Sequence, residues 1–489
     1  MHWGAAACRH DDHRGQRLRP RKGHTEIYRG AEYTVLGLPD GQTSQHRGDM
    51  RAMSIRWSAV VATAGIALGS PAPAFAEAGA INAADTAWMT SATGLVLMMS
   101  IPGLALFYCG MVRKKNVLAT MAQTLACTFM GSILWAVACY SLTFSGDGAF
   151  IGTLDQIFLL NIGMETTSPL AATIPEILFM AYQMTFAVIT VALVAGSVAD
   201  RMRFSAFVWF AILWLPIVYV PIAHWVWGNG WLMKLGILDF AGGTVVHLNA
   251  GVAGLVAAYV VGRRAGYGSE NFAPYDLSLA VIGTGLLWVG WFGFNGGSAL
   301  AAGSRAAFAI VATHLAASAG ALTWTLLEWW TRGKPSVLGM ISGAVAGLGT
   351  ITPASGFVLP WHGIVIGITA GAVCFWACTK LKQALGYDDS LDVFGVHGVG
   401  GAAGTLLTGV FATAALSISP DTPAGSPGLL EGNPGQVLIQ LYGIVATIAW
   451  SALATFVLLK AIGLIVPLRV SKESEIDGLD LTQHGEALQ

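Results

Sequence analysis

The chain has 489 residues, of which 54% are hydrophobic and 11% are charged, and its mean hydropathy is +0.62. Soluble globular proteins contain about 25% charged residues, so this composition excludes an ordinary cytosolic enzyme and indicates a protein embedded in lipid. The formal net charge of −1 provides no basic surface for a nucleic acid, so that class of partner is excluded too.

The N-terminal part of the chain reads as two segments outside the folded protein. Residues 1–49 are polar and lack hydrophobic periodicity, which predicts an untranslated or disordered extension. Residues 50–76 have the three parts of a secretory signal peptide: basic residues at the start (Arg51 and Arg56), an apolar stretch, and an A-x-A site that ends at Ala76. We expect cleavage after Ala76. The alternative is that the apolar stretch remains as an extra span, although it is shorter than the about 20 residues that a span needs.

Residues 77–466 are predicted to form the membrane domain, because they contain eleven apolar runs of membrane-spanning length. The runs lie at 86–109, 117–143, 175–198, 204–226, 241–261, 277–297, 303–331, 336–352, 359–379, 393–413 and 436–465. The result is an all-α polytopic membrane protein with eleven transmembrane helices.

Basic residues gather in every second connection between these runs. They are Arg113, Lys114, Lys115, Arg201, Arg203, Arg263, Arg264, Arg332, Lys334, Lys380 and Lys382. The positive-inside rule places these connections in the cytoplasm, together with the C-terminal tail of residues 467–489, and it places the mature N-terminus outside.

One pattern occurs twice, 150 residues apart. His247 is followed at +4, +6 and +7 by Gly, Ala and Gly, and His397 is followed by the same residues at the same offsets. A segment containing an aspartate opens each span, with Asp239 in the first and Asp392 in the second. This pattern predicts two halves of five spans each, as in a transporter built from repeats with its pathway at their interface.

The two histidines are candidate functional residues, because an ionisable side chain inside an apolar span needs polar partners. Offsets of 0, +4 and +7 lie on one helix face, so each histidine shares its face with glycines that permit close packing, and we expect His247 and His397 to meet. The alternative is a pair of hydrogen-bonded core histidines. A metal site is disfavoured, because zinc usually takes three or four ligands and no Cys or carboxylate accompanies either histidine.

Aromatic and acidic residues near the predicted outer surface leave two interpretations open. Asp239 is positioned to cap the fifth span, and a buried carboxylate there would also favour a nearby cation. Trp225 and Trp227 end the fourth span, while Tyr182 and Phe186 are four residues apart and share a face of the third. Such residues either anchor the protein in the bilayer or form an aromatic cage for a cation.

Longer motifs carry a family resemblance. They are Phe107–Arg113 (FYCGMVR), Arg203–Ala206, Pro221–Gly228, Asp239–Asn249 (DFAGGTVVHLN), Gly290–Asn295 with Ser298, Arg332–Ser336 (RGKPS) and Asp392–Gly398. Together they resemble the ammonium transporter (Amt/Mep) family, bacterial type. The resemblance spans roughly residues 86–484.

The resemblance implies a non-enzymatic transporter of the bacterial inner membrane with no cofactor. Its fold has two inverted five-helix repeats plus a final helix, and it assembles as a homotrimer with one pore per subunit. The substrate is ammonium or ammonia, with methylammonium as an analogue. The tail at 467–489 resembles a regulatory tail, and docking of a PII-type signal protein at the cytoplasmic face is implied.

The resemblance also implies site residues. Those of the external ammonium site are Trp227, Phe186, Ser298, Tyr182 and Asp239. A gate of stacked rings is implied for Phe186 and Phe294, and pore lining for His247, His397 and Trp291. Tyr182 stands where the family pattern has Phe, which adds a hydroxyl that we expect at the vestibule.

Two functions of other classes remain open. One is an ammonium sensor that uses the transporter fold, for which a separate partner is expected because no output domain follows the last predicted span. The other is a membrane enzyme with a di-histidine site. The residues alone do not distinguish NH3 from NH4+ as the net species.

Overall fold

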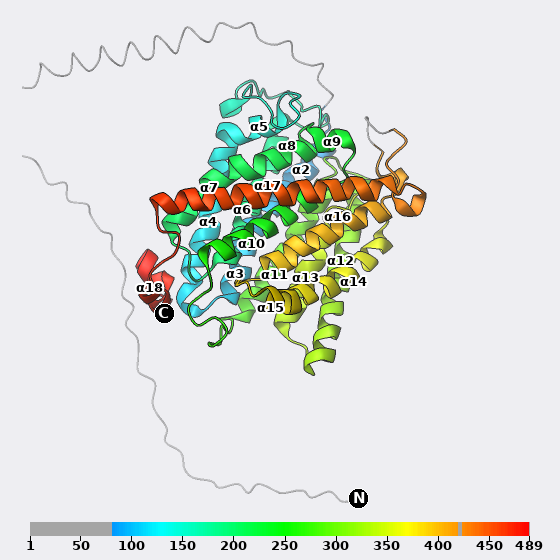
Figure 1. Ribbon diagram of the computed structural model, residues 1–489. Coiled ribbons are helices and arrows are strands. Elements are labelled where there is room, and N and C mark those ends of the chain that lie inside the picture. The colour runs from blue at the N-terminus through cyan, green and yellow to red at the C-terminus, as the bar shows by residue number, and fades with distance from the viewer. Residues whose placement is uncertain (1–80, 419–422, 489) are drawn as a thin grey trace, which may run out of the picture. The chain divides into compact units, whose positions relative to one another are not determined.

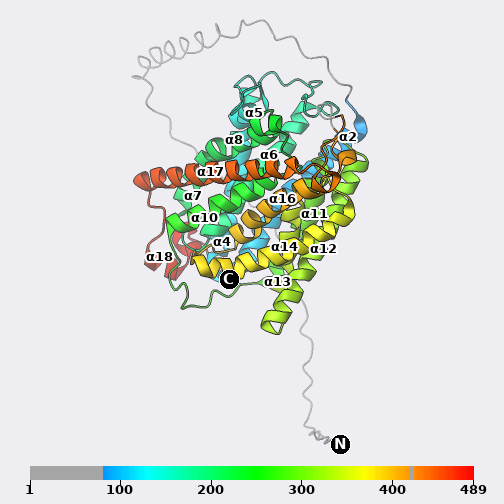
Figure 2. The same cartoon turned by 45° about the vertical axis from the view of Figure 1, so that its right-hand side comes forward.

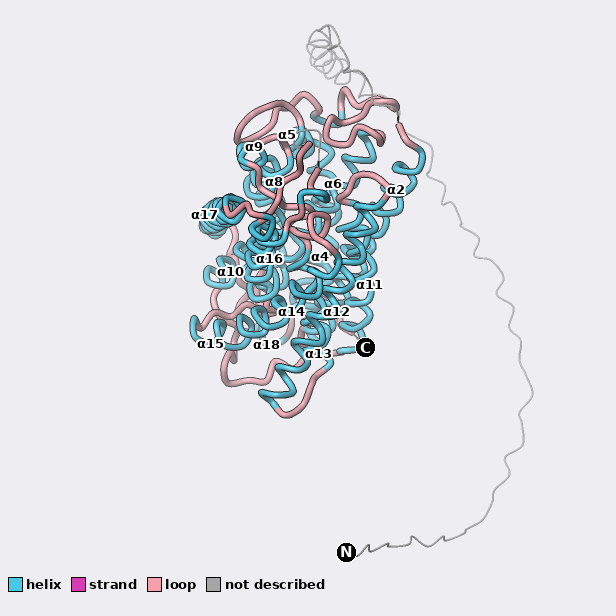
Figure 3. Tube along the Cα trace, turned by 90° about the vertical axis from the view of Figure 1, so that its right-hand side faces the viewer, coloured by secondary structure: helices cyan, strands magenta, loops and turns pink. Residues whose placement is uncertain are grey.

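The computed structural model describes residues 81–418 and 423–488, and within these ranges the regular structure is helical, without strands (Figures 1 and 3). The predicted extension (1–49) and signal peptide (50–76) lie outside the described residues.

The first five predicted spans are each found as a helix or as a series of stacked helical segments. In chain order these are α2 (Ala83–Met98), η1 (Met99–Leu104) and α3 (Ala105–Met111); α4 (Val117–Leu134), η3 (Trp135–Cys139) and α5 (Tyr140–Phe144); α6 (Glu176–Val198); α7 (Phe204–Trp214), η5 (Leu215–Tyr219), α8 (Val220–Trp227) and α9 (Trp231–Leu235); and η6 (Gly243–Leu248) with α10 (Asn249–Val261).

The remaining six spans follow in the same way. They are α11 (Leu277–Gly297); α12 (Ser304–Arg332); α13 (Val337–Ile351); α14 (Pro360–Trp376), η7 (Ala377–Leu381) and α15 (Lys382–Leu385); η8 (Phe394–Gly398) with α16 (Val399–Phe411); and α17 (Gly435–Ile465). The short segments α18 (Lys472–Asp477) and η11 (Asp480–His484) end the described chain.

Ten of the eleven spans are long and apolar enough to cross a membrane, and the eighth, α13, is a shorter apolar helix of 15 residues. At 1.5 Å per residue α13 covers about 22 Å, less than the about 30 Å of a hydrocarbon core. Pro353 follows directly after Thr352, the C-cap residue of this helix. Because α13 is largely buried among other helices, its length need not match the thickness of lipid.

Several spans contain a wide π-helical turn, and two of these turns have an evident cause. Pro102 lies in η1 and Pro216 in η5, and proline cannot donate the hydrogen bond that would keep an α-helical turn closed. The turns η6 and η8 instead contain His247 and His397, each just before a regular helix begins. Both histidines therefore sit where the backbone is locally widened.

Contacts between helices join the first and second halves of the chain. The helix pairs α2 with α11 and α12 with α14 run side by side, while the long helix α17 lies across α10 and α16 (Figures 1 and 2). α10 and α16 also contact the widened turn of the opposite repeat, α10 with η8 and α16 with η6. The two predicted copies of one helix therefore meet at the centre of the bundle.

Loops that were predicted to share one side of the membrane do meet at one end of the bundle. The buried Arg264 forms ion pairs with Asp388 (2.7 Å) and Asp200 (3.4 Å), and these three residues come from three different connections. Burial raises the pKa of Asp388, but the Arg264 guanidinium outweighs burial and holds it below its ordinary value.

The C-terminal segment docks at the same end. The backbone N–H of Leu479 donates to Asn116 Oδ1 (2.8 Å), and the N–H of Ala119 donates to the Asp480 carboxylate (2.8 Å). The N–H of Ala265 donates to Glu475 (2.6 Å). Part of the predicted tail is thus bound to the connections that precede α4 and follow α10.

Candidate functional site

A cavity of about 190 Å³ lies beside Trp227, and we call it the Trp227 pocket. Its lining includes Trp227, Phe186, Ser298 and Gln183. The rings of Phe186 and Trp227 meet edge to face with centroids 5.6 Å apart, and Trp227 Nε1 donates to the Asp239 carbonyl (2.8 Å). Several aromatic rings, a hydroxyl and an amide therefore converge on one small cavity.

The hydroxyls of Ser298 and Tyr182 have different surroundings. Ser298 Oγ donates to the Phe294 carbonyl (2.8 Å) and lies 3.3 Å from the Tyr182 hydroxyl, so at least one of its two lone pairs is left to accept from a molecule in the pocket. Tyr182 is fully buried, and its hydroxyl lies 2.7 Å from the Phe294 carbonyl and 2.9 Å from that of Gly293. The hydroxyl expected at the vestibule thus faces α11, and Tyr182 does not line the Trp227 pocket.

Asp239 caps η6. Its Oδ1 accepts from the N–H groups of Gly242 (2.8 Å) and Gly243 (2.6 Å), and its Oδ2 accepts from the N–H of Thr244 (2.7 Å). The Thr244 hydroxyl also donates to Oδ2. Of the two roles considered for Asp239, this geometry supports capping, because both carboxylate oxygens are used to satisfy the start of a helix.

Two phenyl rings, those of Phe186 and Phe294, lie between the Trp227 pocket and the next cavity. The Phe186 and Phe294 centroids are 4.2 Å apart with an interplanar angle of 33°. Phe186 lines the Trp227 pocket, and Phe294 lines the next cavity along, so the ring pair separates the two spaces.

The next cavity, the histidine cavity, has a volume of about 10 Å³ and includes His247, His397, Trp291 and Phe294 in its lining. His247 Nδ1 and His397 Nδ1 are 3.2 Å apart, and the two rings are nearly parallel at 13°. Trp291 stacks on His247 with centroids 5.4 Å apart. The expectation that the two histidines meet is thus matched by the geometry, in a space about the size of one water molecule.

The glycines four residues after each histidine allow this meeting. A Cβ on Gly251 would clash with the backbone of Gly398, directly after His397. A Cβ on Gly401 would lie 2.8 Å from Leu248 N, directly after His247, and 3.1 Å from the His247 Cβ. Each glycine therefore makes room for the histidine segment of the other repeat.

The repeat corrects one pairing of aspartates. Asp389, rather than Asp392, is the counterpart of Asp239, because Asp389 Oδ2 accepts from Phe394 N (2.7 Å) at the start of η8. Asp392 instead forms an ion pair with Lys382 Nζ (2.6 Å). Asp239 and Asp389 each lie eight residues before their histidine. This shared offset is visible in the sequence, but the family motif that begins at Asp392 drew attention to the wrong aspartate.

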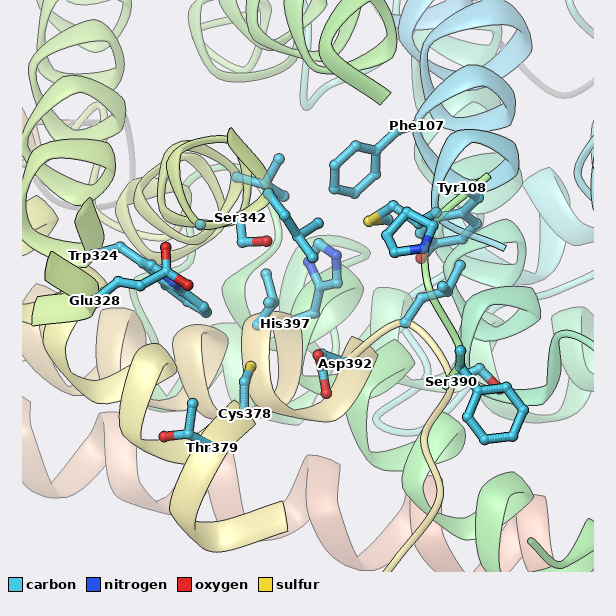
Figure 4. Close-up of a pocket in the computed structure, with 18 of the residues that line it drawn as sticks. Phe107, Tyr108, Trp324, Glu328, Ser342, Cys378, Thr379, Ser390, Asp392 and His397 are labelled. Carbon is cyan, nitrogen blue, oxygen red and sulfur yellow. The ribbon is translucent and has the colours of Figure 1, made fainter. Parts of the chain in front are cut away.

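A third cavity, of about 210 Å³, lies on the other side of His397, and we call it the Asp392 pocket (Figure 4). His397 lies at the centre of the close-up, between Phe107 and Asp392. Because His397 and Phe107 line both the histidine cavity and the Asp392 pocket, the three cavities follow one another through the bundle.

Gln183 and Phe107 are among the lining residues that sequence reasoning did not identify. Gln183 lines the Trp227 pocket, and the signal for it is its position on the α6 face that also carries Phe186. Phe107 lies in a recognised motif but received no role.

Comparisons with known proteins show the family of this chain. Residues 87–488 match the model of the Ammonium Transporter Family. An ammonium transporter of Bacillus subtilis is 47% identical over 402 residues, covering 82% of this chain and 97% of the relative. The crystal structure of Saccharomyces cerevisiae Mep2 matches with a TM-score of 0.74 and 39% identity, covering 80% of this chain and 88% of that one. A structure described as a sensor Amt protein matches with a TM-score of 0.74 and 28% identity, covering 82% and 98% of the two chains. With a family match over most of its length, the chain belongs to the ammonium transporter family.

Proposed function

We propose that this protein transports ammonium by recruiting NH4+ in the Trp227 pocket and conducting ammonia through the histidine cavity. The observation that carries the proposal is the order of the groups along the bundle: an aromatic pocket, a pair of phenyl rings in contact and a pair of hydrogen-bonded histidines. Family membership supports the substrate.

The physical chemistry of the two cavities supports recruitment of a cation in the Trp227 pocket and passage of ammonia through the histidine cavity. The ring faces of Trp227 and Phe186 replace part of the hydration of a cation, and the Ser298 oxygen accepts one of its N–H groups. The apolar walls beyond Phe294 penalise a bare ion by many kcal/mol, whereas neutral ammonia passes at lower cost. The hydrogen bond between the Nδ1 atoms of His247 and His397 offers a route for relaying the proton left behind.

Transport is tested with purified protein reconstituted into proteoliposomes. Ammonium pulses over a solid-supported membrane should produce currents when the net transport is electrogenic, and methylammonium uptake should report transport in either case. If the protein gives no current and no uptake above the level of empty liposomes, the proposal is contradicted.

Trp227→Leu should raise the methylammonium concentration that gives half-maximal uptake (K0.5) by about two- to thirtyfold. The reason is that a cation–π contact contributes roughly 0.5–2 kcal/mol. Trp227→Phe keeps a ring face but loses the hydrogen bond to Asp239, and its K0.5 should stay closer to wild type. Trp209→Leu is the control, because Trp209 is half exposed and lies outside the pocket. An unchanged K0.5 in Trp227→Leu would place recognition elsewhere.

We also propose the assembly and placement that the family suggests. The protein is a homotrimer in the bacterial inner membrane, with the Asp392 pocket on the cytoplasmic side and the mature N-terminus outside. The docked C-terminal segment, which includes Glu475 and Asp480, is a regulatory tail next to the surface that a PII-type signal protein would contact. Its contacts with the preceding connections support this role.

N-terminal sequencing of the protein purified from membranes should give Glu77, because signal peptidase cleaves after an A-x-A site. Recovery of Met1 or Met50 as the first residue would contradict the proposed processing.

The match to a sensor Amt protein favours ammonium sensing as a second candidate function. A sensor would bind ammonium without a sustained flux. Methylammonium uptake that continues over many turnovers supports transport, whereas saturable binding without uptake supports sensing.

A further inference from the structure

We propose a second cation site, for ammonium or methylammonium, at Glu176 in a cavity next to the Trp227 pocket. The proposal rests on the proposed function and extends it, because this site would hold the cation before it reaches Trp227. The cavity, here called the Glu176 cavity, has a volume of about 660 Å³ and lies beneath the long connection between α5 and α6.

The Glu176 carboxylate is buried, and only one of its two oxygens accepts hydrogen bonds from described residues. The residue is 7% exposed, and its Oε1 accepts from the Tyr140 hydroxyl (2.9 Å) and from Gln156 Nε2 (2.6 Å). Both neighbours donate, which is the arrangement that a carboxylate anion satisfies. Oε2 accepts no hydrogen bond from any described residue, and Glu176 lines the cavity.

No described Lys or Arg forms an ion pair with Glu176. A buried negative charge without a counter-charge is costly, and a small cation that can donate hydrogen bonds relieves that cost. The position of Glu176 in the first turn of α6 contributes, because the helix N-terminus stabilises an anion there. Ammonium fits these requirements: it is a monovalent cation and a hydrogen-bond donor.

The geometry links Glu176 to the Trp227 pocket along one helix. Positions 176, 179, 183 and 186 follow one face of α6, and the last three line the Trp227 pocket. Phe144 lines both cavities, and its ring packs edge to face on Phe179 with centroids 5.0 Å apart. A cation held by Glu176 is therefore next to the aromatic residues that would receive it.

Glu176→Gln tests the charge with little change of shape, because the amide oxygen can still accept from Tyr140 and Gln156. K0.5 for methylammonium uptake should rise about tenfold with an unchanged maximal rate, since a carboxylate at a pocket concentrates cations by roughly this factor or more. Glu176→Asp should restore most of the affinity, and Asp155→Asn, which removes a charge from the same connection outside the cavity lining, should leave K0.5 unchanged.

A second variant avoids the buried position. Met164 lines the cavity and is 88% exposed, so Met164→Lys adds a competing ammonium group without disturbing the core. It should raise K0.5 as Glu176→Gln does, while Met164→Gln should not. If Glu176→Gln and Met164→Lys both take up methylammonium with the wild-type K0.5, the Glu176 site is overturned and the proposed transport function stands. Absence of uptake by the wild-type protein would overturn the proposed function, and the site with it.

Discussion

His247→Ala and His397→Ala should each reduce methylammonium uptake by about tenfold to a hundredfold or more. The two Nδ1 atoms share one hydrogen bond at 3.2 Å, so one ring donates while the other accepts. Removing either ring strands the remaining nitrogen in a cavity with room for about one water, at a cost of roughly 1–3 kcal/mol.

The same pair faces the proposed path. His247 Nε2 has no hydrogen-bond partner among the described residues, and it is therefore able to bond a molecule in the cavity. His397→Glu keeps an acceptor at mid-membrane and should retain some conduction, with weaker selectivity against potassium because of the added charge.

His314→Ala is the matched control for the histidine variants, because His314 is an exposed histidine of α12 outside the three cavities. It should transport like the wild type. The prediction fails if His247→Ala and His397→Ala both assemble normally and both give wild-type ammonium currents with wild-type selectivity against potassium. The two histidines would then be structural.

Gly251→Ala should abolish transport and lower the thermal unfolding midpoint of the purified protein. The new methyl group would overlap the backbone of Gly398, which cannot rotate away as a side chain can. Overpacking of this kind typically lowers the stability of the fold by about 1–3 kcal/mol. If η8 moves away from α10 to remove the overlap, His397 moves away from His247. Gly401→Ala should act in the same way from the other repeat, through Leu248 and His247.

Gly463→Ala is the control for both glycine variants. Its Cβ would lie 3.5 Å from the Leu468 side chain, an ordinary contact, and alanine is favoured over glycine in a helix by about 0.5–1 kcal/mol. Uptake should be unchanged. Wild-type uptake by Gly251→Ala and Gly401→Ala would mean that the two repeats do not depend on this close approach.

Local sequence determined the helices and their rough limits. In lipid, an apolar run of about 20 residues forms a helix because the helix makes its backbone hydrogen bonds within the same segment. The eleven runs can therefore be recognised without tertiary information. The repeated spacing of His247 with Gly251 and of His397 with Gly401 also indicated which faces would meet. Periodicity places a residue on a face, and small residues on that face predict close packing.

Tertiary structure decided what each polar group faces. Sequence did not show that the Tyr182 hydroxyl points to α11, because that direction depends on a helix more than a hundred residues away. The eight-residue offset that Asp389 shares with Asp239 was present in the sequence, but only the hydrogen bond from Phe394 N showed that Asp389, and not Asp392, caps the second histidine segment. Nothing in the local sequence indicated that Glu176, in the first turn of α6, is buried beside a cavity. Helix formation is governed by interactions within a few residues, whereas the burial and partners of a side chain are set by segments that only the folded chain brings together.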